Sequence, residues 1–388
     1  MFSSNPSSKL LALAHDPSPV PSPFAMKHIV VLALLATLSG ATSAIAQTGS
    51  AKKTKAAGSR AALDALVDKQ GKTPPDWFQA TKLNYPQTLD LSWPEKPAGA
   101  WNNQKNVGQF VWDVINPNPS RWREGVKLMH QLLTMHQKDP EKRERIMLTL
   151  ANMYHNLLED YARAAFWYRA AGVERDPVEF ATSAVVLAEC YWRLGYSDEA
   201  RALLAKVPAG VKHAKLLGDM GEVNKSVQMA SANADAQGYA YLTAGDAYRQ
   251  AGRYAEAVKQ YQRVLAMEIP ANNPPGRLVQ NHKRATANIE AIRAFELFDI
   301  RNVADGRYTA SSQGYEAPVE VAVTVTRGRI AAVNVTRHRE KQFYSAMTDT
   351  PAKIIAKQHV KGVDTTSNAT ITSEAIVNAT AKALAGNQ

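Results

Sequence analysis

Two stretches of the sequence place small and aromatic residues at the same intervals. The intervals are 3, 4, 5, 4 and 3 residues in both stretches. The residues are Ala188, Tyr191, Gly195, Ala200, Leu204 and Val207 in the first, and Gly245, Tyr248, Gly252, Ala257, Tyr261 and Val264 in the second. Small residues let two helices cross closely, and aromatic residues fill the groove beside the crossing. The spacing therefore predicts stacked helical hairpins.

A third stretch matches after one inserted residue, and the pattern as a whole resembles the tetratricopeptide repeat. Its members are Ala151, Tyr154, Ala164, Tyr168 and Ala171. The resemblance implies an all-α solenoid over residues 120–268 that docks protein partners. Tyr154, Tyr191 and Tyr248 are 37 and 57 residues apart, against a repeat of about 34 residues. The longer gap leaves room for another, irregular helical pair within residues 211–234.

The periodicity changes after the helical region. Prolines interrupt the chain within residues 269–298, where a helix over 279–298 can cap the solenoid. Two runs of β-branched residues, separated by Arg327 and Gly328, then predict an antiparallel hairpin. The predicted strands are 319–325 and 330–336, with an extended segment at 306–310 and helices at 350–359 and 374–384. Residues 299–388 are thus expected to form a small α+β domain.

A turn rich in hydroxyl groups runs into the last of these helices. It reads Asp364-Thr365-Thr366-Ser367-Asn368-Ala369-Thr370, followed by Thr372 and Ser373. The first N–H groups of a helix are unpaired, and its dipole is positive there, so a phosphate is well placed at such a turn. An ordinary helix cap is the alternative, because Asp, Ser, Thr and Asn are also favoured at that position.

Several landmarks in residues 305–384 resemble the FMN-binding domain of flavin-carrying subunits in the sodium-pumping NADH:quinone oxidoreductase and the Rnf complex. They are Asp305-Gly306-Arg307-Tyr308-Thr309, Gly314-Tyr315, Arg327-Gly328-Arg329-Ile330, His338-x-Glu340 and the turn ending at Thr370. The resemblance implies that a flavin transferase uses FAD to attach FMN to the Thr370 hydroxyl through a phosphoester bond. It also implies that Asp364 serves in recognition by the transferase. Asn368 stands where the family has Gly, and Asn tolerates the left-handed backbone that Gly often supplies.

The remaining candidate cofactor-binding residues surround Thr370 in the sequence or in the family pattern. They are Ser367, Asn368, Ala369, Thr372, Ser373, His338 and Glu340. Arg337–Lys341 is either a source of positive field near the flavin or a solvated charged turn. No catalytic set beyond the flavin is evident, which favours an electron carrier over a complete enzyme.

Composition limits the other redox centres that this chain can hold. Cys190 is the only cysteine, so no internal disulfide, c-type haem or cysteine-bound iron–sulfur cluster is possible. The histidines show no metal-ligand spacing, so no metal is expected. The net charge of +11 favours anionic partners or cofactors. No nucleic-acid-binding motif accompanies this charge, and nucleic acid is not expected as a partner.

The first 46 residues have the features of a leader with an export signal. Met26-Lys27-His28 precedes an apolar run over 29–38, and Ala44-Ile45-Ala46 fits a cleavage site before Gln47. Met26 is the expected start, and a long leader is the alternative. An uncleaved anchor is disfavoured because the apolar run is short for a membrane span. We therefore expect a periplasmic or other extracytoplasmic protein without a membrane span after cleavage.

Two segments join the leader to the repeats. Residues 47–73 are small, polar and Lys-rich, and they predict a flexible linker with a short helix near 61–67. Residues 74–119 form an irregular Trp- and Pro-rich segment, for which burial of the tryptophans is favoured over a ligand-binding surface.

The whole sequence thus predicts an exported flavoprotein that exchanges electrons with an unknown donor and acceptor in a membrane-associated redox chain. The alternative is an extracytoplasmic tetratricopeptide scaffold whose C-terminal domain is vestigial or binds FMN reversibly.

Overall fold

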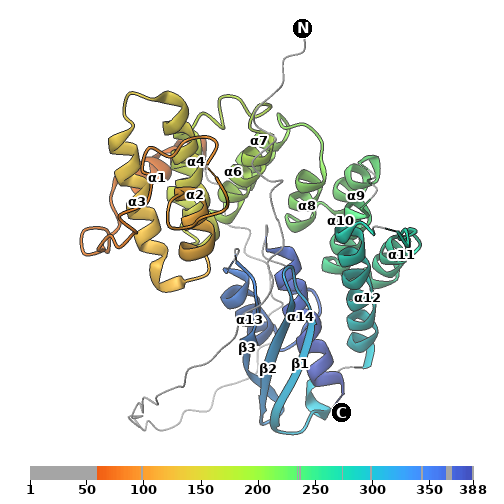
Figure 1. Cartoon of the computed structure of the whole chain (residues 1–388). Coiled ribbons are helices and arrows are strands. Elements are labelled where there is room, and N and C mark those ends of the chain that lie inside the picture. Colours follow the sequence, from red (N-terminus) through yellow and green to blue (C-terminus); the bar gives the residue numbers. More distant parts are fainter. Residues whose placement is uncertain are drawn as a thin grey trace, which may run out of the picture. The chain divides into compact units, whose positions relative to one another are not determined.

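A computed structural model gives the structure of residues 59–386, apart from residues 98, 234, 236, 273, 298, 342–343 and 364–368 (Figure 1). The leader lies outside the described residues, as do three predicted site residues, Asp364, Ser367 and Asn368. No helix in the described ranges is both long enough and apolar enough to cross a membrane.

The first described element is helix α1 (Arg60–Lys72), which covers much of the segment predicted as a flexible linker. The Ser59 side chain caps it by accepting a hydrogen bond from the Ala62 N–H. Leu63 and Val67, one turn apart, are fully buried, and α1 packs on α5 (Tyr161–Ala170). The helix is therefore longer than expected, and this apolar stripe fixes it to the repeats.

The Trp-rich segment that follows is irregular, as predicted, but its tryptophans differ in burial. It contains α2 (Val107–Phe110), the π-helical turn η2 (Val111–Ile115) and the 3₁₀ turn η3 (Pro119–Arg121). Trp93 is 8% exposed, whereas Trp101 is 55% exposed. Trp93 thus packs in the core, and Trp101 does not.

Helical hairpins occupy the next part of the chain. The helices are α3 (Trp122–Met135), α4 (Pro140–Asn156), α5, α6 (Ala181–Arg193), α7 (Ser197–Leu204), α8 (Val211–Asp219), α9 (Val223–Ala232), α10 (Tyr239–Gln250) and α11 (Tyr254–Leu265). Consecutive helices pack as the pairs α4–α5, α6–α7, α8–α9 and α10–α11. The pair α8–α9 fills the long gap between the tyrosines. We call the pair α10–α11 the third repeat, since it is the last in chain order of the three stretches recognised in the sequence.

Close helix crossing explains the small residue at Gly245 in the third repeat. A Cβ atom there would lie 2.5 Å from the ring of Tyr261. Tyr261 itself is fully buried, and its hydroxyl donates to Asp246. The sequence spacing therefore reports a real packing constraint between α10 and α11.

A three-stranded antiparallel sheet follows the long helix α12 (Gly276–Leu297) and the 3₁₀ turn η4 (Ile300–Asn302). Its strands are β1 (Gly306–Gln313), β2 (Pro318–Thr326) and β3 (Arg329–Arg337), in the order β1-β2-β3. The extended segment expected at 306–310 is thus a full strand paired with β2. Helix α14 (Thr370–Ala385) packs on β1 and β2, and α13 (Ala346–Lys357) packs on β3. The predicted fold class, helical repeats followed by a small α+β domain, is confirmed.

The hairpin turn between β2 and β3 is built from Arg327 and Gly328. Both have positive φ, 53° and 65°, as the two-residue turns that match the twist of a hairpin require. The Asp305 carboxylate accepts hydrogen bonds from both N–H groups, at 2.7 and 3.2 Å. This contact fixes the start of β1 to the β2–β3 turn, which lies at the same end of the sheet.

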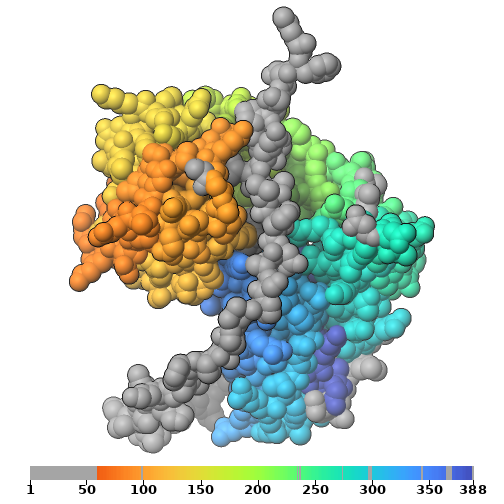
Figure 2. Space-filling model, in the orientation of Figure 1, coloured from red at the N-terminus to blue at the C-terminus, as the bar shows by residue number. Residues whose placement is uncertain are grey.

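The α+β domain shares its hydrophobic core with the third repeat and α12. One buried cluster joins Tyr261, Phe295, Val321 and Ile376, which belong to α11, α12, β2 and α14. Figure 2 shows the surface of α12 adjoining that of the sheet, and α12 contacts β1. The last repeat and the sheet therefore form one packed body.

Candidate functional site

Thr370 is the first residue of α14, and its side chain is partly exposed. Ala369 precedes it at the N-cap position, is 1% exposed and has no hydroxyl or carboxylate with which to cap the helix. The Ser373 N–H donates to the Ala369 carbonyl at 2.9 Å, which begins the helical pattern. The N–H groups before Ser373 are left without an intrahelical acceptor. This end of α14 can therefore accept an anion.

Glu340 lies under the first turn of α14. It is 4% exposed and accepts hydrogen bonds from the Thr372 hydroxyl at 2.9 Å and from the N–H groups of Tyr315 and Glu316 at 2.9 and 3.3 Å. Burial raises the pKa of Glu340, although these hydrogen bonds favour its charged form. One carboxylate thus joins α14 to the loop between β1 and β2.

Gly314 allows this approach. A Cβ atom on it would lie 2.5 Å from the Ala317 carbonyl oxygen and 2.7 Å from Oε1 of Glu340. A larger residue would push the loop away from the carboxylate. The Gly-Tyr pair noted in the sequence therefore has a steric reason.

His338 is near Glu340 but reaches it only through Tyr344. The Tyr344 hydroxyl donates to the Glu340 backbone carbonyl at 2.6 Å, and the rings of His338 and Tyr344 pack edge to face at 5.9 Å. Burial lowers the pKa of His338. The Tyr344 ring also lies 5.3 Å from Trp122 at the start of α3. Among the described residues, His338 makes no hydrogen bond, ion pair or ring contact with Thr370 or Thr372, so it supports the site only through Tyr344.

A second buried polar cluster holds the other side of α14. Nη2 of Arg284, on α12, donates to both oxygens of Glu374, at 3.1 and 3.0 Å. Arg249, at the end of α10, donates to Asn288 at 3.0 Å and to Asn378 at 2.6 Å. All five side chains are buried, which is uncommon for charged groups unless they are paired.

Sequence reasoning missed this cluster. The available signal was a pair of polar residues, Glu374 and Asn378, four positions apart on an alanine-rich helix. That spacing places them on one face. Arg249, the partner of Asn378, and Arg284, the partner of Glu374, lie 129 and 90 residues away in the sequence, and only the tertiary structure brings them together.

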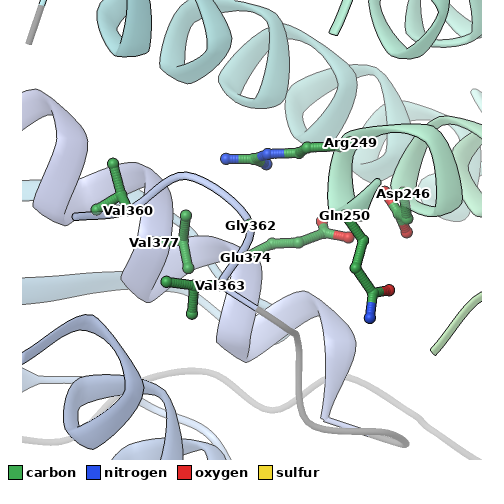
Figure 3. Close-up of a pocket in the computed structure, with 8 residues that line it drawn as sticks. All are labelled: Asp246, Arg249, Gln250, Val360, Gly362, Val363, Glu374 and Val377. Carbon is green, nitrogen blue, oxygen red and sulfur yellow. The ribbon is translucent and has the colours of Figure 1, made fainter. Parts of the chain in front are cut away.

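A small cavity of about 20 Å³ lies between this cluster and the loop that follows α13 (Figure 3). Its lining residues are Asp246, Arg249, Gln250, Val360, Gly362, Val363, Glu374 and Val377. A space of that size holds roughly one water molecule. The flavin ring cannot enter it, so the cavity belongs to the support of α14.

The structure separates the predicted site residues into three groups. Ala369, Thr370, Thr372 and Ser373 lie together at the start of α14, and Glu340 joins them through Thr372. His338 is one ring contact removed. In the basic run, Arg337 is paired at 3.9 Å with Glu320, on the neighbouring strand.

The start of α14 fits an FMN phosphate. Thr370 is a partly exposed residue with a hydroxyl, Ala369 makes no side-chain cap of the helix end, and Glu340 accepts a hydrogen bond from Thr372 in the first turn. Residues 369–373 would therefore hold the phosphate end of the cofactor.

Comparison with known proteins agrees with this geometry. Residues 314–385 match the family model of the FMN-binding domain, and residues 240–275 match that of the tetratricopeptide repeat. An uncharacterized protein of Treponema pallidum (strain Nichols) is 42% identical over 82 residues, which is 21% of this chain and 22% of that protein. The chain thus spans about a fifth of this relative's length. No solved structure matches the chain. The chain therefore contains a C-terminal FMN-binding domain preceded by tetratricopeptide-like repeats.

Proposed function

We propose that this protein is an exported electron carrier with FMN attached to Thr370 through a phosphoester bond. The observation that carries the proposal is the position of Thr370, a partly exposed residue at the start of α14, where Ala369 makes no side-chain cap, within a matched FMN-binding domain. When bound, FMN supplies one- and two-electron chemistry. The chain supplies tethering, orientation and the surrounding charge.

Attachment requires a partner enzyme. A flavin transferase would transfer the FMN moiety of FAD to the Thr370 oxygen, which loses its proton as the new phosphoester bond forms and AMP leaves. Asp364, Ser367 and Asn368 would complete the motif that this enzyme recognises. Export through the signal around residues 26–46 would place the flavin outside the cytoplasm, where a redox protein donates electrons and another accepts them.

The helical repeats are proposed to dock these partners. Trp101, in the Trp-rich segment, and Val178, in the loop after α5, are 55% and 61% exposed. Either can serve as an apolar contact for a partner protein.

Mass spectrometry of the full chain co-expressed with a flavin transferase tests the attachment. We expect the peptide containing Thr370 to gain the mass of FMN less one water, and Thr370→Ala to abolish this gain. Thr366→Ala is the matched control, because it removes a hydroxyl from the same motif and keeps the attachment residue. An unmodified Thr370 peptide with an active transferase would refute covalent attachment. A yellow protein that loses its colour on denaturation would then indicate reversible binding, and a colourless one a scaffold.

A further inference from the structure

Two buried carboxyl groups, those of Asp246 on α10 and Glu374 on α14, lie at the same nitrogen of Arg284: its Nη2 is 3.9 Å from Oδ2 of Asp246 and 3.0 Å from Oε2 of Glu374. Two carboxyls this close together in a buried site cannot both ionise readily, so one of them keeps its proton. Glu374 receives Arg284 on both of its oxygens, which is the arrangement of a carboxylate. Asp246 is therefore the group that carries the proton.

The surroundings of Asp246 agree with this assignment. Its Oδ1 accepts from the Tyr261 hydroxyl of α11 at 2.9 Å, and its Oδ2 lies 3.9 Å from Arg284 of α12. Burial and the neighbouring Glu374 raise the pKa of Asp246 well above its ordinary value. Arg284 and Lys215, on α8, act in the opposite direction without reversing the shift. Lys215 is itself paired with Asp219.

The pKa of Glu374 shifts in the opposite direction. Burial would raise the pKa of Glu374, but Arg284, the hydrogen bond from Asp246 and the nearby Arg249 together lower it. With Asp246 neutral, Glu374 is the one acid that balances the two arginines. The cluster is therefore satisfied with a single ionised carboxyl.

The pair of carboxyl groups lies close to Thr370, the proposed attachment residue, because Glu374 belongs to the same helix. Glu374 follows Thr370 by four residues, so the two lie on one face of α14, one turn apart. Figure 3 shows Glu374 and Asp246 beside the loop at Gly362 and Val363, from which the chain continues into the attachment motif. The contact between Asp246 and Glu374 thus joins the third repeat to the first turns of α14.

We propose that Asp246 is a positioning residue for flavin attachment, which holds the start of α14 against the third repeat only while it carries its proton. The role in attachment rests on the proposed function. When Asp246 ionises, two adjacent carboxylates face each other in a poorly solvated interior, and that arrangement is unfavourable. Opening of α14 exposes Asp246 to water and releases one proton to solvent.

Hydrogen exchange of the unmodified full chain tests the proton linkage. If opening releases one proton, the opening equilibrium of α14 rises about tenfold per pH unit between the open-state and closed-state pKa values of Asp246. Asp246→Asn keeps a donor for Glu374 and an acceptor for Tyr261 but cannot titrate. We expect the ratio of opening constants, parent over Asp246→Asn, to rise by about tenfold per pH unit above the ordinary aspartate pKa of about 3.9, until the raised closed-state pKa is reached. The intrinsic pH dependence of exchange cancels in this ratio.

Two further variants keep the test decisive. If Asp246→Asn does not fold, Glu374→Gln replaces it. This change removes the second carboxylate and lets an ionised Asp246 pair with Arg284, so it should also abolish the pH dependence of the opening constant of α14. Glu189→Gln is the control, because Glu189 is a buried acid on α6 that pairs with His155 instead. It should leave the pH dependence of the opening constant of α14 unchanged. The proposal is overturned if the ratio of opening constants, parent over Asp246→Asn, does not change with pH. Where Glu374→Gln replaces that variant, the same outcome for its ratio overturns the proposal.

Attachment is then measured in vitro with FAD and a purified transferase. The attachment rate of the parent, divided by that of Asp246→Asn, should fall as pH rises, because only the parent loses the positioning contact. The pH dependence of the transferase is common to both proteins and cancels in this ratio. An exchange slope without any change in this rate ratio would refute the positioning role. If neither protein takes up flavin while the exchange slope is present, the proposed function fails and the proton linkage stands.

Discussion

Arg284 on α12 holds the carboxylate of Glu374 on α14 at 3.0 Å, with both side chains almost fully excluded from solvent. This contact links the helix before the sheet to the helix that begins with Thr370. It also means that the FMN-binding domain and the third repeat share a buried electrostatic cluster as well as a hydrophobic core. The two units are therefore expected to unfold together.

Loss of Arg284 should destabilise this joint unit strongly. Arg284→Met leaves Glu374 buried without its cation, and breaking a buried pair in this way costs about 3–5 kcal/mol. The double variant Arg284→Met, Glu374→Gln should recover part of that loss, because the residues are directly coupled. Chemical denaturation measures both effects. Arg301→Met is the control, since its partner Asp299 forms a surface pair, and a comparable loss there would contradict the argument.

Gly245→Ala should destabilise the third repeat. The added methyl group would lie 2.5 Å from the Tyr261 ring, so the ring or the helix must move. Overpacking of this kind costs about 1–3 kcal/mol. Gly210→Ala is the matched control, because no neighbouring atom lies within 4 Å of its added Cβ and its φ of −170° is open to any residue. If thermal unfolding shows that the two variants are equally stable, the packing argument is refuted.

Glu340→Ala should loosen the first turn of α14. The change removes the acceptor for Thr372 and for two backbone N–H groups, and each buried group left unpaired costs about 1–3 kcal/mol. Glu340→Gln should cost less, because its amide oxygen still accepts from the backbone and its amide nitrogen can donate to Thr372. Denaturation, together with flavin occupancy at Thr370, measures the difference. Equal losses in the two variants would show that the hydrogen bonds contribute little.

The buried pair of His155 and Glu189 should make stability depend on pH. Burial disfavours charge on His155, but the Glu189 carboxylate, 3.3 Å from Nε2, outweighs this and raises the pKa of the histidine. Its contribution is complete below the ordinary histidine pKa of about 6.5 and is lost as pH rises through the higher folded value. Glu189 has a lowered pKa, so its own contribution is lost on the acid side. Unfolding free energies of the parent relative to His155→Gln should therefore fall from neutral to alkaline pH, and a flat difference would exclude this linkage.

Local sequence signals predicted the elements of the fold. The intervals around Tyr191 and Tyr248 indicated hairpins because close helix crossings need small residues at fixed positions, and Gly245 shows that need directly. The turn at Arg327 and Gly328 was visible because few residue pairs adopt two positive φ angles. The helix at Arg60–Lys72 was underestimated, since its burial comes from contact with α5 and not from its polar composition.

The residues at the start of α14, and the family motif that they resemble, can be read directly from the amino-acid sequence. The contacts that hold this helix in place depend on how the chain folds. Glu340 reaches Thr372 across 32 residues, and Arg284 reaches Glu374 across 90. Contacts of such separation leave no periodic trace, because each partner is a single polar residue on an apolar face. The physical reason that they persist is burial, which makes an unpaired charge so costly that each must find its partner in the folded chain.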